Sequence, residues 1–139
     1  MNLSGIVLPG PALSPDEVVR LQLAGLGNPR SDGIGVLQCF VLASPGNRAA
    51  TGPLDRFGKM VRRGPFQCLA NQRACLVGRP HIVEHTARVI VTIVDQQAQI
   101  HAFTFVLARQ ASPPFADCWM TEAVWPSFPA DEPKATPAA

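Results

Sequence analysis

The sequence predicts an α+β fold in which three N-terminal helices pack on a curved antiparallel sheet. In the first half of the chain, apolar residues recur at helical spacing behind helix-capping residues, whereas β-branched residues dominate the second half. Helices followed by a run of strands are typical of α+β proteins. The chain has 139 residues, 47% of them hydrophobic and 16% charged, so we expect one domain with a well-filled core.

The first helix is predicted after Ser14, a capping residue followed by Pro15 and, three positions after the cap, by Glu17. Its apolar stripe is formed by Val19, Leu23 and Leu26, and it is expected to end at residues 27–29. A second short helix is expected over residues 32–41, and residues 44–47 are expected to break the chain.

The third helix is predicted to begin with Pro53 in its first turn and to end at residues 64–65. Residues 66–69 then form another helical turn or an apolar plug. From Leu76 onward the pattern changes to strand.

Three strands are predicted in the second half of the chain. Residues 87–94 are apolar on both faces, which is typical of a central strand. Residues 95–98 form a turn, residues 100–109 the next strand, and residues 118–124 a last strand bounded by Pro126. Three short helices can cover only one face of such a sheet, so we expect a homodimer through the open face.

Residues 13–126 are expected to form the domain, preceded by an N-terminal extension (1–12) and followed by a disordered Pro- and Ala-rich tail (127–139). The first residues lack a basic segment followed by an apolar block, and the chain has no apolar run long enough to span a bilayer. We therefore expect a cytoplasmic protein that does not bind membranes.

Basic residues gather in the middle of the chain. Residues 48–88 hold eight Lys and Arg against two acidic residues, a net charge of +6. The pI of about 8.5 is below the range of nucleic-acid-binding domains, so we expect no nucleic-acid partner. The cations of the third helix are expected to bind small anions weakly or to face an acidic protein: Arg56, Lys59, Arg62 and Arg63.

The spacing of cysteine and histidine argues against a metal site. The four cysteines (Cys39, Cys68, Cys75 and Cys118) form no Cys-x-x-Cys pair, so we expect buried or half-buried reduced thiols. His81 and His85 match the H-x-x-E-H pattern of a zinc-protease helix, but their β-branched neighbours predict a strand. No metal or other cofactor is expected.

Three stretches resemble a family of small proteins known only as a domain of unknown function. They are LSPDEVVRLQLAGL, DGIGVLQCFVLASPGNRAATGPLDRFGKMV and CWMTEAVWP, and the resemblance covers about residues 13–126. Its most specific parts are Ala43-Ser44-Pro45 with Asn47-Arg48, Thr51-Gly52-Pro53, and Cys118-Trp119-Met120-Thr121. The order of elements is similar to the nuclear transport factor 2-like, cone-shaped fold. Proteins that resemble this fold include isomerases, dehydratases, epoxide hydrolases and non-catalytic binding modules, so the resemblance implies no single function.

We expect a non-catalytic binding or assembly module. The alternative is a small-molecule enzyme or carrier, isomerase- or dehydratase-like, that uses the apolar interior of the cone. An open interior with a buried acid or histidine would favour an enzyme.

No catalytic residue is assigned. Acid–base candidates near turns or strand ends are His101, His85, Asp95 and Asp117, with Glu122 in mid-strand. The ligand-pocket candidates are Trp119, Phe103, Phe105, His101 and Arg88. For the aromatic residues among them, core packing or a dimer face is favoured over a ligand pocket.

Overall fold

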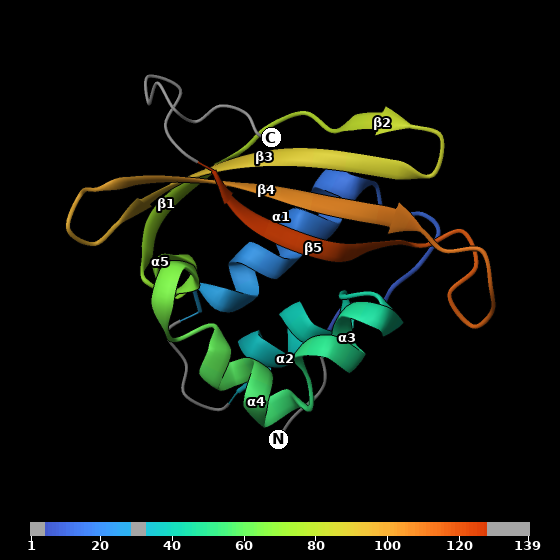
Figure 1. Ribbon diagram of the computed structural model, residues 1–139, viewed down its shortest axis with the longest axis horizontal. Coiled ribbons are helices and arrows are strands. Elements are labelled where there is room, and N and C mark those ends of the chain that lie inside the picture. Colours follow the sequence, from blue (N-terminus) through green and yellow to red (C-terminus); the bar gives the residue numbers. More distant parts are fainter. Residues whose placement is uncertain (1–4, 29–32, 128–139) are drawn as a thin grey trace.

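The computed structural model describes residues 5–28 and 33–127 and confirms the α+β class (Figure 1). The helices come first: α1 (Pro15–Leu26), α2 (Ile34–Val41), α3 (Pro45–Thr51), α4 (Leu54–Met60), the 3₁₀ helix η1 (Gly64–Phe66) and α5 (Gln67–Ala70). The strands follow: β1 (Gln72–Val77), β2 (His81–Val83), β3 (Thr86–Asp95), β4 (Ile100–Arg109) and β5 (Trp119–Ser127).

The strands form one antiparallel sheet in the order β1-β3-β4-β5, with the short β2 paired to β3. The helices lie on one side of this sheet, with α1 directly against it and α2 to α4 farther away (Figure 1). The sheet therefore has an inner face, which meets the helices, and an outer face.

Helix α1 begins as its sequence predicts. The Ser14 hydroxyl accepts the Glu17 backbone N–H, and the Glu17 carboxylate accepts the Ser14 backbone N–H at 2.8 Å. These reciprocal bonds satisfy backbone donors that a helix start leaves without partners. The helix then turns Val19 and Leu23 into the core, where both are fully buried.

The prediction of three helices is wrong in number, because the described chain holds five α-helices and a 3₁₀ turn. Residues 44–47, expected to break the chain, instead begin α3. Ser44 caps it by accepting the Asn47 backbone N–H at 3.2 Å, and Pro45 takes the first turn. This start uses the same Ser-Pro chemistry as α1. Helix α2 begins at Ile34, and residues 29–32 lie outside the described part of the chain.

Strand boundaries differ from the predictions at both ends of the sheet. β1 begins at Gln72 rather than near Leu76, and β5 continues through Pro126 to Ser127. Proline is tolerated there because β5 is an edge strand, on which one side of the backbone needs no partner. Ser127 thus belongs to the sheet, and the rest of the predicted tail (128–139) lies outside the described residues.

The N-terminal residues 5–12 are irregular but fastened to α2. The Val7 N–H donates to Gln38 Oε1 at 2.7 Å, and Gln38 Nε2 donates to the Val7 carbonyl at 2.8 Å. Residues 1–4 lie outside the described part. Within the described residues, no helix has the length and apolar character needed to cross a membrane.

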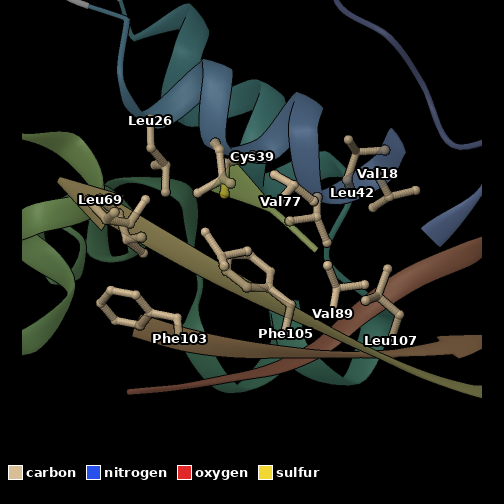
Figure 2. Packing of buried hydrophobic residues seen from close by; sticks show 14 of the residues in the cluster. Val18, Leu26, Cys39, Leu42, Leu69, Val77, Val89, Phe103, Phe105 and Leu107 are labelled. Carbon is tan, nitrogen blue, oxygen red and sulfur yellow. The ribbon is translucent and has the colours of Figure 1, made fainter. Parts of the chain in front are cut away.

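Burial alternates along the central strands. On β3, the inner-face residues from Ala87 to Ile93 are fully buried, and on β4 Phe103, Phe105 and Leu107 join them. Figure 2 shows these β4 side chains on the same side of the sheet as the helices, with Leu26 and Cys39 across from Phe105. The core of the protein is the layer between the helices and this inner face.

The inner face of β3 is apolar, as predicted, but its outer face mixes Ile90 and Val94 with Arg88 and Thr92, and described residues cover only the inner face. On the outer face Ile90 is 59% exposed, Leu76 on β1 is 71% exposed and Trp125 on β5 is 61% exposed. Cross-strand register places Ile90 beside Thr104, and Thr104 beside Trp125. Exposed apolar side chains therefore lie on three strands of this face, with the half-buried Thr104 between Ile90 and Trp125.

Thr121 on β5 joins the sheet to three other segments. Its N–H donates to the Leu42 carbonyl at 3.0 Å, and its carbonyl accepts the Ser44 N–H at 2.9 Å and the Asn47 side-chain amide at 3.0 Å. Its hydroxyl donates to Gln22 Oε1 on α1 at 2.6 Å. Gln22 in turn donates to the Cys39 carbonyl on α2 at 3.1 Å.

We predict that Thr121→Val lowers the free energy of unfolding by about 1–3 kcal/mol, because Gln22 Oε1 loses its donor while buried. Urea denaturation measures the change. Thr92→Val, at a half-buried outer-face position, is the matched control and should alter stability by less than about 0.5 kcal/mol. Equal losses in the two variants would contradict the importance of the Gln22–Thr121 bond.

Candidate functional site

A cavity of about 140 Å³ lies between the helices and the inner face of the sheet. Most of its wall is apolar and comes from helices α1, α2, α4, η1 and α5 and from strands β4 and β5. The apolar lining residues are Leu26, Cys39, Ala43, Phe57, Met60, Val61, Phe66, Leu69, Phe105 and Val124. Four polar residues complete the wall: Gln22, Asn47, Thr51 and Thr121.

The polar residues of the wall are held by the protein itself. Gln22, Asn47 and Thr121 belong to the hydrogen-bond group around Thr121, and the Thr51 hydroxyl donates to the Asn47 carbonyl at 2.9 Å. Among the described residues, no buried side-chain nitrogen or oxygen lacks a hydrogen-bond partner. The cavity is thus an apolar space with hydrogen-bonded hydroxyl and amide groups at one part of its wall.

A second hollow, a polar cleft of about 390 Å³, lies where α5 and η1 meet the β3–β4 turn. Asp95 and His101 line it, together with Cys68 and Phe103. His101 Nε2 is 2.8 Å from Asp95 Oδ2, and the other carboxylate oxygen accepts the N–H groups of Gln97 and Gln99, both at 2.9 Å. Asp95 therefore closes the predicted turn and orients His101.

These contacts set the charge of the Asp95 carboxyl group. The hydrogen bond from His101, followed by the backbone N–H of Gln99, lowers the pKa of Asp95 below its ordinary value. Donors directed at the ionised form stabilise it relative to the protonated form. The carboxylate is accordingly charged at neutral pH, and its hydrogen bonds hold His101 in place.

The structure divides the predicted pocket residues among different places. Phe105 lines the apolar cavity, whereas Phe103 and His101 line the polar cleft. Trp119 lines neither hollow; it is half-buried against the core at the start of β5. Arg88 lies in a surface hollow at the β2–β3 hairpin, far along β3 from Asp95.

The histidines of the H-x-x-E-H pattern lie in this hairpin, where the predicted strand conformation is right for His81 but wrong for His85. His81 belongs to strand β2, and His85 follows in the turn; both line the hollow that contains Arg88. Among the described residues, no group of three or more His, Cys, Asp or Glu side chains is placed to hold a metal ion.

The other acid–base candidates and the basic residues lie at the surface. Asp117 is exposed and pairs with Arg109 at 3.3 Å, and Glu122 is exposed on β5. The cations of the predicted basic helix are all exposed on α4 and the turn after it: Arg56, Lys59, Arg62 and Arg63.

All four cysteines are free thiols, but the expectation that all four are buried or half-buried is wrong for Cys75. Cys75 is exposed because β1 is an edge strand on which four successive residues reach solvent. Cys39 is buried in the cavity wall, and its burial raises the pKa of its thiol to about 12. Burial is also the main cause that raises the pKa of Cys68 and of Cys118.

Most of the chain matches a known protein family. Residues 16–125 match the model of a family described as a domain of unknown function (DUF4864). The chain belongs to this family. No curated protein and no solved structure matches the chain, so the nuclear transport factor 2-like layout stays a prediction.

Every residue that lines the apolar cavity falls within the matched part of the DUF4864 domain. Two of the motifs that carried the resemblance meet beside it: Ala43 forms a parallel bridge with Thr121, and the Ser44 N–H donates to the Thr121 carbonyl. The stretches around Ser44 and Thr121 are thus two sides of one structural contact.

Sequence reasoning missed the polar residues of the cavity wall, Gln22, Asn47 and Thr51. Gln22 lies within the apolar stripe of α1, between Val19 and Leu26. A polar residue inside such a stripe indicates a buried polar contact and could have been noticed in the sequence. Its partner Thr121 is 99 residues away, however, and no local pattern pairs them.

We predict that acid weakens the DUF4864 domain partly through Asp95. Because its folded pKa is lowered, its contribution to stability is fully present above the unfolded pKa of about 3.9 and is lost as the pH falls toward the folded pKa. Asp95→Asn should therefore lose less stability than wild type between neutral pH and pH values below about 4. Urea denaturation across this range measures the difference.

The variant His101→Gln tests whether the hydrogen bond from His101 causes the lowered pKa of Asp95. Since the His101 hydrogen bond is the largest contribution to the lowered pKa, this variant should also flatten the acid dependence. Parallel loss of stability in wild type, Asp95→Asn and His101→Gln would contradict the assigned role of the pair.

We predict that the thiols react in an order set by burial. Cys75 should react first with a thiol reagent and Cys39 last, because the thiolate is the reactive form and burial disfavours it. Pulse labelling of the native protein followed by peptide mass spectrometry measures each rate. Labelling of Cys39 as fast as Cys75 would show that the cavity wall opens readily.

Proposed function

We propose that the DUF4864 domain is a non-catalytic module that self-associates through the outer face of its sheet. The observation that carries this proposal is the exposure of large apolar side chains there, with Leu76, Ile90 and Trp125 each more than half exposed. Contiguous exposed apolar surface marks an interaction site in soluble proteins.

The size of the face supports a second copy as the occupant. β3 and β4 have ten residues each, which corresponds to a length of about 33 Å at the usual rise. β1 and β5 are shorter, with six and nine residues, so four strands about 4.8 Å apart give a face of roughly 550 Å². Two copies bury roughly 1,100 Å² together, just above the roughly 1,000 Å² that a biological interface is expected to exceed.

The charge of the face also supports self-association. Along β3, its residues from Ile90 to Val94 are uncharged, and so are the residues opposite them on β4 and β5. Two identical uncharged surfaces meet without like-charge repulsion. Arg88 lies toward one end of the face, so it is placed at the rim of such an interface.

We expect the full chain to sediment as a dimer at tens of micromolar, and Ile90→Glu with Trp125→Glu to yield a folded monomer, because charges would be buried without partners. Analytical ultracentrifugation measures the mass, and circular dichroism confirms folding. Leu8→Glu is the matched control, since Leu8 is 68% exposed but belongs to no strand, and it should remain dimeric. A monomeric wild type would overturn the proposal.

A small-molecule carrier is the second candidate function, and the apolar cavity favours it. The acid and the histidine that could serve an enzyme, Asp95 and His101, line the polar cleft instead. Asp95 is also fully engaged in closing the β3–β4 turn. Because no acidic residue or histidine in the described part of the chain lines the cavity, the interior supports binding rather than acid–base catalysis.

A further inference from the structure

We propose that the apolar cavity binds a small uncharged molecule that is mostly aromatic or aliphatic and carries one hydroxyl or N–H group. This inference rests on the carrier function and specifies its ligand. It is carried by three properties of the cavity: its volume, the absence of charge from its lining residues, and the hydrogen-bonding state of its polar wall.

The volume sets the size of the ligand. Protein interiors are packed so tightly that voids larger than a water molecule are few, so a space of about 140 Å³ is more than ordinary imperfect packing. A cavity of about 150 Å³ lined by aliphatic and aromatic side chains is large enough for benzene. The ligand therefore has roughly six to ten non-hydrogen atoms, depending on how far the half-buried side chains move.

The lining residues exclude a charged ligand. They are aliphatic, aromatic, sulfur-containing or neutral polar, and none carries a charge at neutral pH. A charged group moved from water into such surroundings loses its hydration without gaining an ion pair, which is strongly unfavourable. Carboxylates, phosphates and ammonium compounds are thus disfavoured.

The hydroxyl groups of the wall favour a hydrogen-bond donor. The Thr51 hydroxyl donates its proton to the Asn47 carbonyl, and the Thr121 hydroxyl donates its proton to Gln22. A hydroxyl has one proton and two acceptor positions, so each oxygen retains acceptor capacity only. The side-chain amides of Gln22 and Asn47 each use one of their two N–H groups, for the Cys39 and Thr121 carbonyls, so the wall also keeps donor capacity. A phenol-like hydroxyl, which both donates and accepts, complements this wall, and an indole-like N–H complements its hydroxyl oxygens.

The half-buried lining residues indicate where the ligand enters. Asn47 and Thr51 lie on α3, Met60 at the end of α4, Phe66 on η1 and Val124 on β5. The remaining lining residues are buried. Entry is therefore between the α3–α4–η1 segment and the edge strand β5.

Phe66 also separates the cavity from the polar cleft. Its ring stacks on Phe103 with ring centroids 6.2 Å apart, and Phe103 lines the cleft while Phe66 lines the cavity. The two hollows therefore adjoin across this pair, and the aromatic contact keeps the Asp95–His101 pair out of the ligand space.

The test is an NMR titration of the ¹⁵N-labelled full chain with phenol, indole, benzene and benzoate. Phenol and indole should shift the amide signals of cavity residues such as Leu69 and Phe105. Benzene should bind more weakly than phenol, because it leaves the hydroxyl acceptors unused. Benzoate should bind at least about tenfold more weakly than phenol, since its charge has no partner.

Two variants locate the site. Cys39→Met adds volume inside the cavity and should weaken phenol binding at least about tenfold. Val61→Ile, which fills another part of the wall with one added methylene, serves if Cys39→Met fails to fold. Cys75→Met is the matched control at an exposed thiol and should bind phenol as wild type does.

The possible outcomes test the ligand class, the binding site and the carrier function separately. Benzoate binding as tight as phenol at the same cavity signals would overturn the ligand class and leave the carrier function standing. Phenol binding that neither cavity variant weakens would overturn the site. If none of the four probes binds at millimolar concentration, both the inference and the carrier function are wrong, whereas the proposed dimer is unaffected.

Discussion

The architecture depends on the hydrogen bonds made by Thr121. Its backbone and hydroxyl bind the segment after α2, the start of α3 and the buried Gln22 of α1, so one residue of an edge strand positions three helical segments. Gln22 is almost completely buried, and its oxygen would be costly to leave without a donor. This requirement fixes the distance between β5 and the helices, and with it one wall of the cavity.

The same hydrogen bonds explain how a cavity persists in the core. The helices rest on the sheet through α1, whose Val18, Val19 and Leu23 are fully buried, while polar bonds to β5 hold α2 and α3. A helical layer held by directional bonds has less freedom to collapse into empty space than one held by apolar packing alone. The space between Phe57, Phe105 and Val124 is left where neither contact fills it.

The sequence predicted the helices and strands that are determined by residues close together in the chain. The Ser14 cap with Glu17 located the start of α1. The β-branched apolar run over residues 87–94 and the two faces of residues 100–109 located β3 and β4. Helix α3 was missed because Pro45 and Gly46 were interpreted as breakers, although Pro45 is well suited to a first helical turn after Ser44. Among the cavity residues, Phe105 was predicted as an aromatic residue that points to the interior from its strand. The polar residues of the wall were missed because they depend on the contact of Gln22 with Thr121, which only the folded chain brings together.

The alternation of side chains along β4 and β5 separates the two proposed activities. On β4, Phe105 faces the cavity while its neighbours Thr104 and Val106 face outward; on β5, Val124 lines the cavity while Trp125 is exposed on the other face. Successive residues of a strand point to opposite sides, so each activity uses its own set of side chains. The inferred entrance lies between β5 and the helices, on the inner side of the sheet, and a partner on the outer face leaves it open. Self-association and ligand binding therefore do not compete for one surface, and substitutions at Trp125 and at Cys39 are expected to act independently.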